Sequence, residues 1–161
     1  MNRRTLLGTV ATTGIVALTG CLSDGSGGGT PSDTATATDT PTPTPTPTFT
    51  DSDFEVLSTR GGTQVDSATV TVDGTDIVVE GTVWGRDGCR TAELASVNYN
   101  ADELTVAVAT TRRADAGEAC TQGVVEIDYR ATVEFDDAAP GTVVVTHDRG
   151  DGAETVVNTS P

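Results

Sequence analysis

The sequence predicts an all-β domain over residues 53–161, an antiparallel β-sandwich of seven or eight strands. Short runs rich in Val, Ile and Thr alternate apolar and polar residues with a period of two, which is typical of half-buried strands. Clusters of Gly, Asp, Asn and Pro separate these runs, and apolar residues at helical spacing are nearly absent. Such a series favours two packed sheets, which are immunoglobulin-like by analogy of architecture alone.

The expected strands are 54–59, 68–72, 77–84, 92–99, 104–111, 124–135, 142–147 and 154–158. Residues 73–76 and 100–103 have the composition of tight hairpin turns. Residues 136–141, which include Pro140, are expected to form a third turn of this kind.

Alternation also assigns the core of the domain. The apolar side chains expected to face inward are Val70, Val72, Leu104, Val106, Val108, Val125, Ile127 and Tyr129. Glu126, Asp128 and Arg130 are expected to face outward between them. Residues 143–145 are all Val, which predicts a central strand covered on both faces.

Cys89 and Cys120 bracket the expected hairpin of residues 92–99 and 104–111. A disulfide that closes 31 residues would stabilise the fold by about 3.7 kcal/mol on the chain-entropy model. A metal pair or a redox pair is the alternative, but CxxC spacing and a nearby His are both missing from the sequence. We therefore expect a structural disulfide.

Residues 1–20 predict an export signal, because Arg3 and Arg4 precede a weakly apolar stretch that is too short to span a membrane. The arginine pair, followed by Leu6 and Leu7, resembles a twin-arginine signal, which exports proteins already folded.

Cys21 is the expected site of lipidation. Residues 18–20 are Leu, Thr and Gly, and together with Cys21 they resemble a lipobox, where small residues admit the signal peptidase. A buried or disulfide-bonded Cys21 is the alternative. Lipidation of Cys21 also explains the odd cysteine count of an exported chain, since it leaves Cys89 and Cys120 to pair.

Residues 21–52 are expected to form a disordered stalk that carries the domain. A Gly/Ser run at 25–29 precedes Thr at every second position, with four prolines between the last of them. This composition cannot bury a core and favours an extended, semi-rigid spacer of at most about 90 Å. Dense Thr beside Pro suits O-glycosylation, and an unmodified linker is the alternative.

The charge balance is strongly acidic. The chain has 24 Asp plus Glu against nine basic residues, all of them Arg, and a formal net charge of -15. General nucleic-acid binding is excluded, because it needs clustered Lys and Arg. An acidic chain without Lys that carries these signals and this stalk resembles the secreted lipoproteins of halophilic archaea, whose function is not characterised. The resemblance implies export, a lipid anchor and stability that depends on salt, and it implies no activity.

Catalytic and metal-binding patterns are not apparent. His147, beside Asp148, is the only imidazole, no G-x-S-x-G elbow is present, and His147 is expected to be an exposed residue at a strand end. One His cannot build a blue-copper site, and the calcium-loop motif is missing. Residues 149–151 spell Arg-Gly-Asp, which we attribute to composition. We expect no enzyme, no cofactor and no metal.

Two surface features remain. Arg86, Arg90, Arg112 and Arg113 lie in the segments that flank the two cysteines. They either neutralise neighbouring carboxylates or contact an anion or an acidic polymer. Asn158 begins an N-glycosylation acceptor in what is expected to be an exposed tail.

These observations predict a protein that is lipid-anchored on the extracellular face of the cell membrane and serves as a non-catalytic binding or interaction module of the envelope. Its expected partners are the membrane, through the anchor, and an envelope protein or a soluble ligand, but no nucleic acid. The alternatives are a ligand-binding or accessory subunit of a membrane transport system, which needs a deep pocket, and a small surface hydrolase, which needs His147 or a buried carboxylate in a cleft.

Overall fold

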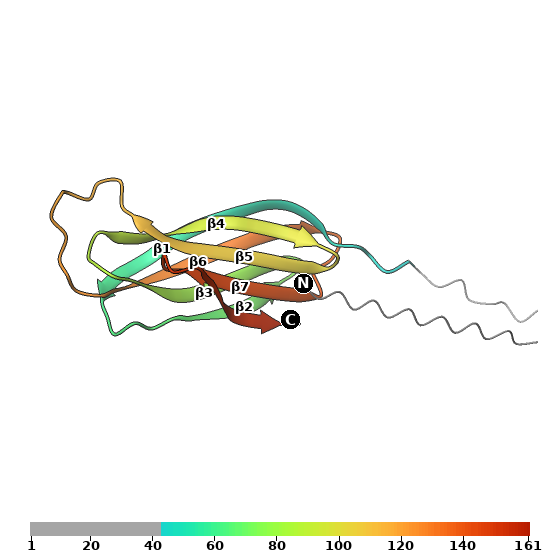
Figure 1. Ribbon diagram of the computed structural model, residues 1–161. Coiled ribbons are helices and arrows are strands. Elements are labelled where there is room, and N and C mark those ends of the chain that lie inside the picture. Colours follow the sequence, from blue (N-terminus) through green and yellow to red (C-terminus); the bar gives the residue numbers. More distant parts are fainter. Residues whose placement is uncertain (1–42) are drawn as a thin grey trace, which may run out of the picture. The chain divides into compact units, whose positions relative to one another are not determined.

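Eight strands form in the predicted order within residues 43–161, the part of the chain that the computed structural model describes (Figure 1). They are β1 (Thr48–Gly61), β2 (Ser67–Asp73), β3 (Asp76–Gly85), β4 (Arg90–Asn100), β5 (Glu103–Arg112), β6 (Val125–Asp136), β7 (Thr142–Asp148) and β8 (Ala153–Thr159). The described residues contain no helix long and apolar enough to cross a membrane.

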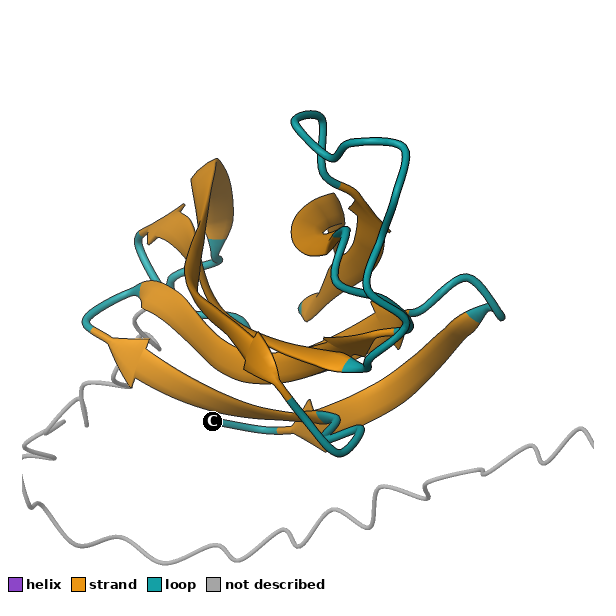
Figure 2. Cartoon of the chain, turned by 90° about the vertical axis from the view of Figure 1, so that its left-hand side faces the viewer, coloured by secondary structure: helices purple, strands orange, loops and turns teal. Residues whose placement is uncertain are grey.

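The strands pack as two sheets of four, which confirms the β-sandwich (Figure 2). One sheet has the order β1-β6-β3-β2 and the other the order β4-β5-β7-β8. Residues 137–141 lead from β6 in the first sheet to β7 in the second, so the prediction of a hairpin turn there is wrong. This crossing sets β7 parallel to β5, with Val145 opposite Val106, whereas the other strand pairs are antiparallel.

β1 begins at Thr48, so residues 48–52, which the sequence assigned to the stalk, belong to the sheet. A β-branched and aromatic segment follows directly after Pro47, the last proline of the repeat, and such residues favour a pleated strand. Phe49 packs edge-on against Phe135 with ring centroids 6.0 Å apart. The Thr50 hydroxyl donates a hydrogen bond to the Glu134 carbonyl at 2.9 Å.

The core lies between the sheets and contains most of the predicted apolar residues. Its fully buried side chains include Ile77, Val79, Val83, Leu104, Val106, Val108, Ile127, Tyr129, Ala131, Val133, Val143 and Val145. The prediction for Val72 is wrong, because this residue lies near the end of edge strand β2 and is 37% exposed. β7 is an inner strand of its sheet, as predicted, but Val144 on its outer face is only half-buried.

The connections between the strands gather at two opposite ends. The turn end comprises residues 74–75, 101–102 and 137–141, together with Thr48, which pairs with Asp136. The loop end comprises residues 62–66, 86–89, 113–124 and 149–152. In Figure 1 the loop of residues 113–124 projects from one end while β1 starts at the other, and Figure 2 presents the loop end to the viewer.

Candidate functional site

The predicted modification sites are Cys21 and Asn158. Cys21, the export signal and residues 21–42 of the predicted stalk lie outside the described residues. Asn158 is exposed, but it belongs to edge strand β8 and pairs with Val144, so the expectation of a tail is wrong. Its pairing places the acceptor near the turn end.

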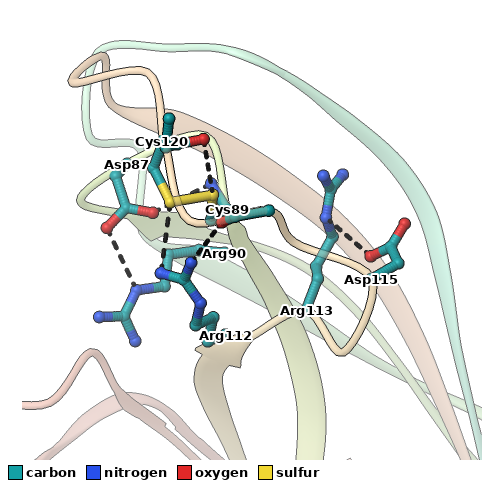
Figure 3. The surroundings of a disulfide bond; sticks show 9 residues. Asp87, Cys89, Arg90, Arg112, Arg113, Asp115 and Cys120 are labelled. Carbon is teal, nitrogen blue, oxygen red and sulfur yellow. Dashed lines mark hydrogen bonds and ion pairs between the residues drawn. A yellow bond between two sulfur atoms is a disulfide. The ribbon is translucent and has the colours of Figure 1, made fainter.

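Cys89 and Cys120 form the predicted disulfide at the loop end, with Cα atoms 5.5 Å apart (Figure 3). Two backbone hydrogen bonds fix the same region, from Gly88 N–H to the Thr121 carbonyl at 3.0 Å and from Arg113 N–H to the Cys89 carbonyl at 2.8 Å. The Asp87 carboxylate lies close to both sulfurs, but these are bonded to each other and offer no thiolate to a metal. The disulfide therefore holds the longest loop against the β3–β4 connection.

The four arginines predicted as an anion contact all lie at the loop end, with different partners, and Figure 3 shows Arg90, Arg112 and Arg113. Arg90 pairs with Asp87 at 3.6 Å, and Arg113 pairs with Asp115 at 3.4 Å. Neutralisation of neighbouring carboxylates thus accounts for these two.

Arg112 and Arg86 bond to uncharged acceptors instead. Arg112 donates to the Gly117 carbonyl at 2.6 Å and to Cys120 Sγ at 3.3 Å. Arg86 donates to the Arg149 carbonyl at 2.9 Å. Among residues 43–161 neither guanidinium forms an ion pair.

Charge is distributed unevenly along the domain. Of the seven arginines in residues 43–161, six lie at or beside the loop end: Arg60, Arg86, Arg90, Arg112, Arg113 and Arg149. The strand ends and turns of the turn end carry six carboxylates and no arginine: Asp73, Asp76, Asp102, Glu103, Asp136 and Asp137. The loop end also carries eight carboxylates, Asp66, Asp87, Asp115, Glu118, Glu126, Asp148, Asp151 and Glu154, so the fold gathers the arginines at one end without giving that end a net positive charge.

His147 is fully buried, and the prediction of an exposed strand-end residue is wrong. It continues the inward row of Val143 and Val145 on β7, and its ring reaches two partners. The Tyr129 hydroxyl on β6 donates to His147 Nε2 at 2.7 Å. His147 Nδ1 bonds to the Asp66 carboxylate in the loop between β1 and β2. A carboxylate can only accept, so Nδ1 carries a proton, and in the neutral ring Nε2 is left to accept from the Tyr129 hydroxyl.

Burial lowers the pKa of His147 to about 4 and raises the pKa of the Tyr129 hydroxyl. The Asp66 carboxylate on Nδ1 opposes the shift of His147, but Arg149 pairs with the same carboxylate and offsets its charge. The neutral imidazole therefore prevails at neutral pH.

Arg149 connects the hydrogen-bonded residues Tyr129, His147 and Asp66 to the surface. It pairs with Asp66 and with Glu154, and its guanidinium lies over the Trp84 ring at 5.3 Å from the centroid. The side chain of Arg149 is only 13% exposed, and these contacts hold it within the domain. The Arg-Gly-Asp tripeptide therefore does not present its arginine to a partner.

The loop of residues 62–66 also covers Glu126, which the sequence assigned to the exposed face of β6. Thr63 N–H donates to its carboxylate at 2.8 Å, and Arg60 pairs with it at 3.3 Å. The hydrogen bond from Thr63, with a smaller contribution from Arg60, lowers the pKa of Glu126 although burial opposes the shift. Through Asp66 and Glu126 the loop is fastened to both sheets.

Sequence reasoning missed Asp66, Arg149 and the Tyr129 hydroxyl as partners of His147. The imidazole of His147 has no access to solvent, so the hydrogen bonds that join it to Tyr129 and Asp66 link polar groups inside the core. A hydrolase would need that imidazole in a cleft.

Open grooves cross the outer face of the β1-β6-β3-β2 sheet. The larger, about 570 Å³, is lined by polar residues that include Asp73, Asp76, Glu80, Arg130 and Thr132. Glu80 and Glu55 both pair with Arg130, whereas Asp73 and Asp76 form no ion pair among the described residues. Neither this groove nor its neighbour is an enclosed pocket of the kind that a ligand-binding subunit needs.

Comparison of the chain with protein-family models, with curated proteins and with solved structures finds no match. Its function is therefore inferred from its own residues and geometry.

Proposed function

We propose that this protein is lipid-anchored on the extracellular face of the cell membrane and that its β-sandwich is a non-catalytic module that binds an envelope component through the loop end. The observation that carries the proposal is the opposition of the two ends. The chain reaches its first strand at Thr48, at the turn end, and β6 separates Thr48 from the loop end by roughly 35 Å. A stalk from Cys21 would thus join the domain at the end opposite the loops.

The construction of the loop end supports a binding role. Binding residues lie preferentially on loops that a rigid scaffold positions. Here a disulfide fastens the loop of residues 113–124, while a hydrogen bond to His147 and an ion pair with Arg149 fasten Asp66 in the loop of residues 62–66. Such loops lose little conformational entropy when a partner binds.

Local charge supports the same surface. At molar salt the Debye length is about 3 Å, so the net charge of the domain acts weakly on an approaching partner and short-range contacts decide binding. The loop end offers arginines among its carboxylates, whereas the strand ends and turns of the turn end carry carboxylates and no arginine. The burial of the single imidazole favours binding over catalysis.

Site-specific photocrosslinking on intact cells tests this proposal. A photoreactive residue at Gln122, exposed in the loop of residues 113–124, is expected to capture an envelope component. The matched control is Asn100, which is exposed at the turn end. Equal capture from both positions, or capture from Asn100 alone, would contradict the proposal, as would a protein recovered only from the cytosol.

A further inference from the structure

The inward rows of β4 and β5 end in arginine at the loop end. Arg90 and Arg112 lie directly opposite each other in the β4–β5 ladder, two positions beyond buried Ala92 and Thr110. They therefore share one face at the mouth of the sandwich. Like charges in a direct cross-strand pair destabilise a sheet. An internal counter-charge or an anion from outside would relieve this repulsion.

The internal counter-charge reaches only one member of this pair. Asp87 neutralises Arg90, but Arg112 bonds only to a carbonyl and a disulfide sulfur among the described residues. Arg86, three residues before Cys89, bonds only to a carbonyl as well. Each guanidinium has five N–H donors, so most donors of these two exposed arginines remain available.

Both guanidinium groups are held in place. Arg112 spans the loop of residues 113–124 between Gly117 and Cys120, which the disulfide fixes to Cys89. Arg86 lies against the turn of residues 149–152, where a Cβ on Gly150 would come within 2.7 Å of its Nη2. Guanidinium groups fixed in this way suit the planar, bidentate recognition of carboxylate and sulfate.

The surroundings favour a hydrophilic partner. Protein partners bind mainly through apolar and aromatic anchors at the centre of an interface. The exposed large apolar residues of the described part are Phe49, Val56, Leu57, Val65 and Val72, and none lies in residues 86–89 or 113–124. A single exposed ion pair contributes little, at most about 1 kcal/mol. A ligand with repeated charges overcomes this weakness by multivalent contact.

We propose that Arg86 and Arg112 form a binding site for an acidic polysaccharide that carries carboxylate or sulfate groups. This site rests on the proposed function, since it names the ligand class for the loop end. Arg90 stays paired with Asp87, and Arg113 stays paired with Asp115, so neither belongs to the site.

The test measures binding of the full-length, detergent-solubilised protein to dextran sulfate and to polygalacturonate, with neutral dextran as a blank. The variant Arg86→Gln/Arg112→Gln is expected to lose at least about tenfold in affinity, equivalent to about 1.4 kcal/mol. The control Arg113→Gln/Arg130→Gln makes the same change in net charge at two ion-paired arginines and is expected to change affinity less than about twofold. Binding of only one polymer would assign the site to sulfate or to carboxylate.

Equal losses in the two double variants, or no loss in either, would overturn the site, as would a wild-type protein that binds neither polymer. Because Arg112 also supports a loop, Arg112→Lys and the single variant Arg86→Gln are measured beside their thermal unfolding. Lys keeps the charge but lacks the planar fork, so reduced binding in both Arg112→Lys and Arg86→Gln, with unchanged melting temperatures, is the expected result. Capture of an envelope component from Gln122 without binding of either polymer would leave the proposed function standing and reject this site.

Discussion

The Tyr129 hydroxyl lies 2.7 Å from Nε2 of His147 in the core between the two sheets. Tyr129 belongs to β6 and His147 to β7, which are consecutive in sequence but lie in different sheets. Their hydrogen bond therefore joins the two layers, and Asp66 extends it to the loop of residues 62–66. Phe54 stacks on the Tyr129 ring with centroids 5.5 Å apart, which fixes the phenol in this position.

Removing the Tyr129 hydroxyl should weaken the fold. Tyr129→Phe leaves His147 Nε2 buried without a donor, and an unsatisfied buried polar group costs about 1–3 kcal/mol. Denaturant unfolding measures this loss. The control is Tyr99→Phe, since the Tyr99 hydroxyl makes only a long, exposed contact of 3.5 Å with Asp102. A loss in the control that matches the loss at Tyr129 would show that the buried bond adds nothing.

Stability should fall as the pH is lowered below neutrality. The pKa of His147 is about 4 in the folded protein and 6.5 in an unfolded chain. Between these values the unfolded state binds a proton that the folded state does not, so acid favours unfolding. The expected loss from pH 7 to pH 5 is about 2 kcal/mol.

The control for this pH dependence is His147→Gln, which removes the titrating group. Urea unfolding at constant salt is measured for both proteins at the two pH values. The wild type should lose about 2 kcal/mol more than the variant. Equal losses of unfolding free energy in the wild type and the variant would contradict the lowered pKa of His147. They would mean that the Asp66 carboxylate offsets the effect of burial on the imidazole.

Gly81 should not tolerate a side chain. A Cβ at this position would lie 2.5 Å from the Tyr129 hydroxyl oxygen and 2.8 Å from the Ser67 carbonyl, which is backbone and cannot turn away. Overpacking of this kind costs about 1–3 kcal/mol, so Gly81→Ala should lower the melting temperature. Gly61→Ala is the matched control, because a Cβ there meets nothing within 4 Å. An unchanged melting temperature for Gly81→Ala would contradict the close packing of Gly81 against the Tyr129 hydroxyl.

The disulfide should contribute strongly to stability. Cys89 and Cys120 are 31 residues apart, and replacing both with Ser should cost about 3.7 kcal/mol through the entropy of the unfolded chain. Unfolding free energies of the variant and of chemically reduced wild type are expected to agree. The longest loop should also become sensitive to proteases, and a protease-resistant variant of undiminished stability would contradict this role.

Local pattern was sufficient to predict the strands and much of the core. The alternation of Leu104, Val106 and Val108 is written within a single strand, so it needs no knowledge of the partner sheet. The same reasoning extended from Val143 and Val145 would have placed His147 inward. His147 is polar and lies near a strand end, however, and these two features favour an exposed residue.

Tertiary relationships were not predictable in the same way. Asp66 lies 81 residues from His147 in sequence, in a loop with no periodicity, and nothing local marks it as a partner. The crossing of residues 137–141 between the sheets depends on which strand edges are free, and a turn composition cannot reveal this. The pairing of Arg90 and Arg113 with Asp87 and Asp115 could be anticipated, whereas the isolation of Arg86 and Arg112 could not.

Intact mass spectrometry of the protein extracted from cell membranes is the most direct test of whether the β-sandwich domain is attached to the cell surface. The predicted result is a chain that starts at Cys21 and carries lipid on that residue, with the pair Cys89 and Cys120 oxidised. A full-length chain that begins at Met1 in the soluble fraction, or a mature chain with an unmodified Cys21 thiol, would contradict the account.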